Sequence, residues 1–207
     1  MFSEISYAEI PYILGALLIS LGFHEAMHAY VAHKLGDTTA YEEGRLTLNP
    51  LKHVDLITTV LLPLVLMLIH LPPILIAKPV PFDPSQVRHG EYGSALIALA
   101  GPFTNLGLAA LTALLIHIGI PMDGIIGHAA GWFIIVNVSL FVFNMLPIPP
   151  LDGSRLLYAF APEPVQRVMQ QIEQLGFMFI VVILLVLLPV LGPILSTINS
   201  TILDFLL

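Results

Sequence analysis

The chain has 207 residues, of which 57% are hydrophobic and only 10% are charged, whereas a soluble domain carries roughly a quarter charged residues. Bulk water is therefore excluded as the solvent for most of its surface, and several apolar runs reach the roughly 20 residues that cross a hydrocarbon core of about 30 Å. A net charge of -7 without any cluster of lysine or arginine excludes a nucleic-acid-binding protein. The absence of cysteine excludes disulfides and thiolate metal sites, so a metal would have to be held by His, Asp or Glu.

The first predicted element is a transmembrane helix over residues 11–33, because Pro11 suits a first helical turn and Gly36 suits a helix end. Residues 35–49 are polar with partial alternation, which predicts short strands and a small β-hairpin region near the membrane and the active site. The apolar stretch 54–77 is long enough to cross, but its three prolines permit a re-entrant path.

The second half of the chain contains three further apolar segments. Residues 93–118 and residues 128–145 each predict a membrane span, and the prolines that follow residue 145 unwind the second of these helices. Residues 175–207 are too long for one straight crossing, so we expect the prolines and glycine within them to kink or divide the helix. The sequence thus predicts an all-α polytopic membrane protein with about four to six transmembrane helices, folded as one integral-membrane domain over residues 1–207.

Three ionisable residues lie within five positions of the first span, in the sequence His24-Glu25-Ala26-Met27-His28. Residues four apart share one face of a helix, so both histidines can present nitrogens to one metal ion. Glu25 lies beside them, where a carboxylate can take a proton from metal-bound water and pass it to a leaving amine. Because ionisable residues in a span each cost roughly 2.5 to 3.5 kcal/mol on insertion scales, chance packing explains this cluster poorly.

A catalytic zinc usually has three protein ligands, so one more residue is needed. Asp152 is our candidate because it follows a helix end broken by proline, where a carboxylate can line a cavity without facing lipid. The alternative is that Asp152 only forms a turn, since Asp-Gly is an ordinary turn pair. Gly101, Pro102 and Asn105 favour a structural role, because small residues allow close helix approach and Asn can join helices by hydrogen bonds.

Three ordered motifs resemble those of the site-two proteases, which are intramembrane zinc metalloproteases. The motifs are His24-Glu25-Ala26-Met27-His28, Gly101-Pro102-x-x-Asn105 and Asn144-x-x-Pro147-x-Pro149-x-Leu151-Asp152-Gly153. The resemblance implies that His24, His28 and Asp152 bind one zinc ion per chain, and that Glu25 is the general base. It also implies that Asn144 lies near the substrate or the oxyanion. The stretch Gly44-Arg45-Leu46-Thr47-Leu48-Asn49-Pro50, continued through His53 and Asp55, resembles the short prokaryotic branch of the family, which lacks a PDZ domain.

The distribution of cationic residues predicts the orientation in the membrane. If residues 54–77 are re-entrant, all seven lysines and arginines fall on one face, and this face is expected to be cytoplasmic. We therefore expect a multi-pass protein of the prokaryotic cell membrane, with its active site toward the cytoplasm. The expected partners are the lipid bilayer and transmembrane protein substrates, cleaved within or near their membrane segments, and assembly into a homo-oligomer is left open.

Two other functions use the same ligands or setting. A membrane metal transporter or metal-sensing protein could hold a metal on the same side chains without hydrolysis, but it has no need for a carboxylate placed as a general base beside the histidines. A di-iron lipid oxygenase ranks last, because that chemistry needs several histidine-rich clusters and this chain has one.

Overall fold

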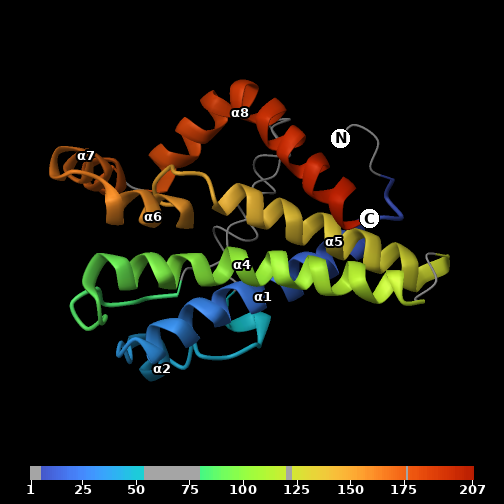
Figure 1. Cartoon of the computed structure of the whole chain (residues 1–207), viewed down its shortest axis with the longest axis horizontal. Helices are drawn as coiled ribbons and strands as arrows, with labels where there is room; N and C mark the ends of the chain where they lie inside the picture. The colour runs from blue at the N-terminus through green and yellow to red at the C-terminus, as the bar shows by residue number, and fades with distance from the viewer. Residues whose placement is uncertain (1–5, 54–79, 120–122, 176) are drawn as a thin grey trace.

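The computed structural model describes residues 6–53, 80–119, 123–175 and 177–207, and within these ranges all regular structure is helical. Three long helices, α1 (Ile10–Lys34), α4 (Gly90–His117) and α5 (Gly124–Asn144), pack against one another (Figure 1). The short helix α6 (Asp152–Phe160) packs on α4, and α7 (Glu163–Gln174) follows it. The last helix, α8 (Phe177–Leu206), packs against α5. The prediction of an all-α protein is confirmed for these residues.

Four helices are long and apolar enough to cross a membrane, namely α1, α4, α5 and the part of α8 from Pro189 to Leu206. Their bounds lie within four residues of those predicted for the first three spans. α8 is assigned as one helix with Pro189 and Pro193 inside it, and it bends near its middle (Figure 1). A proline removes one backbone hydrogen bond and is the usual cause of such a bend. The predicted re-entrant path of residues 54–77 lies outside the described residues.

α1 ends in a left-handed turn at Gly36, whose φ is +106°. The Gly36 N–H donates to the His33 carbonyl at 3.2 Å, and the Asp37 N–H donates to the Ala32 carbonyl at 3.0 Å. These two bonds form the Schellman arrangement, which satisfies the last carbonyls of a helix and favours glycine at the left-handed position. The prediction that Gly36 ends the first span is therefore confirmed.

The prediction of a β-hairpin over residues 35–49 is wrong, because these residues form the short helix α2 (Thr39–Glu42) and turns. Asp37 is buried, and its Oδ1 accepts hydrogen bonds from the backbone N–H of Thr39 at 2.9 Å and from its hydroxyl at 2.6 Å. The Glu42 N–H donates to the Thr38 carbonyl at 2.9 Å. These backbone N–H groups therefore form hydrogen bonds within the segment and do not pair with a second strand. The buried carboxylate of Asp37 outweighs the weak alternation of the sequence.

α4 runs antiparallel to α1, and α5 runs antiparallel to α4, so three ends of these long helices come together. The Arg88 N–H donates to the Leu35 carbonyl at 2.9 Å, so α4 begins beside the end of α1. α5 follows α4 within seven residues and packs back along it (Figure 1). The end of α1, the start of α4 and the end of α5 therefore lie at the same end of the bundle, as the position of Asp152 requires.

Small side chains of α4 meet branched side chains of α5 in the contact between these two helices. The buried residues of this core are Ala109, Ala113, Ile134, Val138 and Val142. Alanine lets two backbones approach closely, and close packing drives helix association in lipid, where apolar burial offers little gain. α8 covers this core with partly buried side chains, among them Leu195 and Ile202. The packing of α4, α5 and α8 is therefore held by complementary shape.

Candidate metal centre

His24 and His28 lie one turn apart on α1, where they are 4% and 8% exposed. Their ring centroids are 4.6 Å apart with an interplanar angle of 82°. The Nε2 atoms of both rings face Asp152, whose Oδ2 lies 3.1 Å from His24 and 3.5 Å from His28. One ligand atom from each of the three residues lies within 4.8 Å of the others. Residues separated by 128 positions, which the sequence proposes as one ligand set, thus meet in one cluster.

The opposite nitrogens of the two rings are held by α4. His28 Nδ1 lies 2.7 Å from the Ile97 carbonyl, and His24 Nδ1 lies 2.6 Å from Asn105 Oδ1. A carbonyl only accepts, so His28 must carry its hydrogen on Nδ1 and present the Nε2 lone pair to the cluster. A hydrogen bond on the far ring nitrogen is the usual support of a metal-binding histidine. Two such imidazoles and one carboxylate fit the three-ligand set of a catalytic zinc.

Asp152 is the first residue of α6, and the glycine after it lets that helix begin directly against the end of α5. A Cβ on Gly153 would lie 2.7 Å from the Leu146 carbonyl oxygen, a distance that real side chains do not adopt. Burial raises the pKa of Asp152, but the imidazoles of His28 and His24 outweigh burial and hold the pKa below its ordinary range. The side chain is therefore anionic, as a carboxylate ligand of a metal ion would be.

Gly101 and Asn105 occupy the face of α4 that meets the histidines. A Cβ on Gly101 would lie 2.6 Å from His24 Nε2 and would also overlap the ring of His28. Pro102, the third residue of the predicted structural motif, is fully buried within α4. The motif therefore does more than join two helices: the missing side chain makes room for both imidazoles, and the amide of Asn105 contacts one of them.

The candidate general base, Glu25, is 7% exposed on α1. Its Oε2 accepts a hydrogen bond from the Val80 N–H at 3.0 Å, while Oε1 makes no hydrogen bond within the described part of the chain. Asn144, the candidate substrate contact, is the last residue of α5, eight positions before Asp152. One N–H of its amide donates to the Leu140 carbonyl at 3.0 Å, which leaves the other N–H available to a ligand.

The remaining histidines that the structure describes lie outside the three-residue cluster. His53 is buried and contacts the Thr47 carbonyl through Nε2 at 2.9 Å, whereas Asp55 and His70 lie outside the described residues. The sequence could not indicate the Val80 N–H or the Ile97 carbonyl, because backbone partners carry no side-chain signal. Asn137, which contacts Asn105, did carry a signal, since a polar residue inside an apolar span is rare and usually functional.

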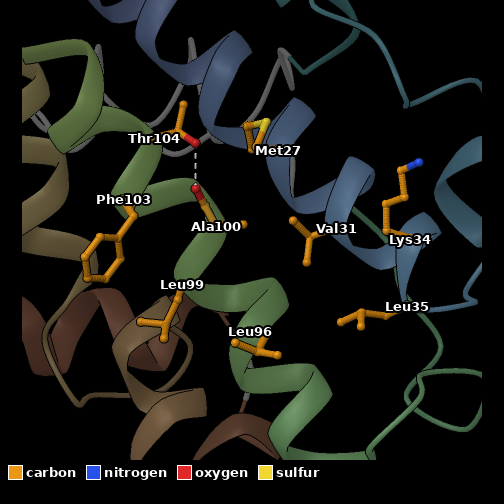
Figure 2. Close-up of a pocket in the computed structure, with 9 residues that line it drawn as sticks. All are labelled: Met27, Val31, Lys34, Leu35, Leu96, Leu99, Ala100, Phe103 and Thr104. Carbon is orange, nitrogen blue, oxygen red and sulfur yellow. Dashed lines mark hydrogen bonds between the residues drawn. The ribbon is translucent and has the colours of Figure 1, made fainter. Parts of the chain in front are cut away.

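A groove of about 480 Å³ runs between α1 and α4 beside the metal centre (Figure 2). Among the residues that the structure describes, its walls are apolar side chains from both helices together with Thr104, and Lys34 is the one charged residue. None of these described lining residues is a histidine or a carboxylate, so the groove is distinct from the cluster of His24, His28 and Asp152. Met27 and Ala100 line it one position before His28 and Gly101, so the two features are immediate neighbours.

Comparisons with known proteins agree with this geometry. The model of peptidase family M50 matches residues 118–188. The chain is 35% identical over 187 residues to "Putative zinc metalloprotease YwhC" of Bacillus subtilis (strain 168), covering 84% of this chain and 80% of that protein. It is 32% identical over 163 residues to "Putative zinc metalloprotease MJ0611" of Methanocaldococcus jannaschii, covering 76% and 75%. It is 30% identical over 178 residues to "Putative zinc metalloprotease Rip2" of Mycolicibacterium smegmatis, covering 83% and 66%. No solved structure matches the chain significantly. The chain belongs to peptidase family M50, the site-two protease family.

Proposed function

We propose that this protein is an intramembrane zinc metalloprotease, which hydrolyses peptide bonds within or near transmembrane segments of other membrane proteins. The meeting of His24, His28 and Asp152 inside a bundle of membrane-length helices carries the proposal. Membership of peptidase family M50 and the names of the relatives support zinc as the metal and hydrolysis as the reaction. The ligand set holds one zinc ion per chain, and the whole of residues 1–207 acts as one membrane domain.

A zinc ion on these ligands supplies Lewis-acid activation of a water molecule and of the scissile carbonyl. Glu25 acts as general base: as the water oxygen attacks the carbonyl carbon, the carboxylate takes a proton at Oε1. It then delivers this proton to the amide nitrogen as the C–N bond breaks, so the products are a free carboxylate and a free amine. The Val80 N–H orients the carboxylate by its bond to Oε2.

Asn144 and the burial of the cluster complete the chemistry. The Asn144 N–H that is not bound to Leu140 donates to the substrate carbonyl oxygen as negative charge develops on it. Because the histidines and Glu25 are nearly fully buried in the bundle, lipid is kept away from the reacting groups. A substrate helix must unwind locally, since its amide carbon is otherwise shielded by its own backbone.

The active site faces the cytoplasm in this proposal. Lys34 ends α1, Arg88 precedes α4, and Arg155 and Arg167 follow α5, so these four cations lie at the end of the bundle where the three helix termini meet. Lysine and arginine accumulate in short cytoplasmic loops. Asp152 enters the bundle from this same end.

The test is cleavage of a panel of single-span membrane proteins by the purified protein in detergent, with bound zinc quantified. Glu25→Gln keeps the volume of the side chain but cannot accept the proton, so we expect it to retain zinc and to lose cleavage by roughly 10²- to 10⁴-fold. Glu43→Gln, the same change at an exposed residue near α2, is the matched control and should cleave as the wild type does. Equal cleavage by the two variants would refute the general-base role. Zinc in all three proteins with no cleavage by any would instead favour a metal-handling protein.

A further inference from the structure

Two buried amides connect His24 to α5. Asn137 lies in the middle of α5, and its Oδ1 lies 2.8 Å from Asn105 Nδ2. Asn105 lies on α4 with its Oδ1 2.6 Å from His24 Nδ1. Both asparagines are 0% exposed. These two residues, named here the amide chain, therefore form a continuous path of hydrogen bonds across all three long helices.

The direction of every hydrogen bond in the amide chain is fixed by its two outer contacts. Asn137 Nδ2 lies 2.8 Å from the Phe133 carbonyl, and Asn105 Nδ2 lies 3.3 Å from the Ser20 carbonyl. Backbone carbonyls only accept hydrogen bonds, so each asparagine must turn its NH₂ group toward its carbonyl. Asn137 consequently offers only its oxygen to Asn105, and Asn105 offers only its oxygen to His24.

An oxygen that faces His24 Nδ1 requires the hydrogen to be on that nitrogen. Nε2, which lies 3.1 Å from Asp152 Oδ2, is then the ring nitrogen that is left to bind the metal, where the metal takes the place of any hydrogen shared with the carboxylate. His28 obtains the same tautomer from a backbone carbonyl, that of Ile97. His24 has no carbonyl at this position, and an asparagine alone could present either its oxygen or its NH₂ group to the ring. Two acceptors hold the NH₂ group of Asn105 away from the ring, and Asn137 Oδ1 at 2.8 Å is the shorter contact, against 3.3 Å for the Ser20 carbonyl.

We propose that Asn137, acting through Asn105, is a positioning residue that fixes the tautomer and ring orientation of His24 for metal binding. The inference rests on the proposed metal centre, but it concerns the protein before any metal or substrate is bound. Asn137 does not contact the metal ligands itself. Joining α4 to α5 would be a purely structural role, and such a role would not depend on which atom of each amide faces its neighbour.

The first measurement is made on the zinc-free wild-type protein in detergent. Nitrogen-15 NMR of the histidine side chains distinguishes a protonated ring nitrogen from one that carries a lone pair, and His24→Gln assigns the signal by its loss. We expect the hydrogen on Nδ1 of His24. An Nδ1 atom of His24 without a hydrogen would overturn the proposal without any variant of Asn137 having to fold; a hydrogen on Nε2 is compatible with it, because that atom faces the carboxylate of Asp152 in the zinc-free protein.

The second measurement is zinc affinity, determined by competition with a chromogenic chelator. Asn137→Leu keeps the size of the side chain but removes the acceptor, so Asn105 can turn over. We expect a mixture of His24 tautomers and a rise in the zinc Kd of roughly 10-fold, the lower end of the range for outer partners of metal ligands. Asn199→Leu is the matched control, because Asn199 makes the same bond to the carbonyl four residues earlier, at 2.9 Å, but lies on α8 away from the amide chain.

Asn137→Thr separates direction from packing. A threonine hydroxyl can donate to the carbonyl four residues earlier, as Thr104 and Thr112 do on α4, and its oxygen can still accept from Asn105. We expect this variant to retain the tautomer and most of the zinc affinity. Unchanged affinity and tautomer in Asn137→Leu would overturn the proposal. An affinity loss in that variant, together with a wild type that binds zinc but cleaves nothing, would support the positioning role and count against the protease.

Discussion

Gly101→Ala is the smallest change that should disable the metal centre. The added Cβ would lie 2.6 Å from His24 Nε2 and closer still to His28 Nε2, and ordinary contact begins at 3.4 Å, so the His24 ring must move by about 0.8 Å and the His28 ring by more. The rings cannot easily move away from α4, because their Nδ1 atoms are hydrogen-bonded to Asn105 and Ile97 on that helix, at 2.7 Å or less. Moving them would break these bonds. A functional constellation tolerates displacements of about 0.5 Å. We therefore expect a loss of roughly 100-fold in zinc affinity, which is about 2.7 kcal/mol.

Gly107→Ala on the same helix is the control for this variant, because a Cβ at Gly107 meets nothing within 4 Å. Replacing glycine by alanine in a helix stabilises it by up to about 1 kcal/mol, and this gain is common to both variants. The assay is the rise in thermal unfolding midpoint on adding zinc, which reports affinity for the folded state. Gly107→Ala should show the rise seen in the wild type, and Gly101→Ala should show little or none. An equal rise in the two variants would refute the close approach of Gly101 to the histidines.

Three further predictions concern the anionic ligand, the loop after α1 and the topology. Asp152→Asn removes the negative charge that faces both imidazoles, so zinc affinity should fall at least about 10-fold in a competition assay, and undiminished affinity would exclude Asp152 as a ligand. The buried carboxylate of Asp37 accepts hydrogen bonds from the backbone N–H groups of Thr39 and Asp83, both at 2.9 Å. Asp37→Asn would place an NH₂ group against one of these two donors. It should cost about 2 kcal/mol of stability, visible as a lower unfolding midpoint, and an unchanged midpoint would contradict the capping role. Since the chain has no cysteine, single cysteines at 34 and 167 should label from the cytoplasmic side and one at 123 from the other side; labelling of 34 and 167 from opposite faces would refute the shared helix ends.

The parts of the fold that follow from strong local patterns were predictable from the sequence. Long apolar runs have one satisfactory conformation in lipid, since every backbone group must be paired within the segment. The bounds of α1 also followed, because Pro11 and Gly36 each act through their own backbone geometry. The three-residue cluster was accessible for a related reason: the four-residue spacing on one helix is a local property, and Asp152 follows a predicted span whose end is broken by three prolines.

The loop after α1 was not predictable by the same reasoning. Its partial alternation is a weak signal, and its conformation is decided by one buried carboxylate, that of Asp37, which bonds both to Thr39 nearby and to Asp83 far along the chain. The second of these partners is a tertiary contact. The support of the histidines was hidden in the same way, because the Ile97 carbonyl and the space at Gly101 only acquire meaning once α4 is placed against α1.

The choice of neutral partners for the histidines follows from the membrane setting. In many zinc sites a carboxylate holds the outer nitrogen of a ligand histidine, but here an amide and a backbone carbonyl do so. In the proposed site a divalent ion would bring a charge of +2 against Asp152 and the general base, so a third carboxylate at position 105 would leave an uncompensated charge inside the bundle. Such a charge costs roughly 2.5 to 3.5 kcal/mol on insertion scales. An amide avoids that cost, but unlike a carboxylate it can present the wrong atom to the ring. The fixed contact of Asn137 with the Phe133 carbonyl supplies the missing direction, so the second asparagine is what makes a neutral partner sufficient.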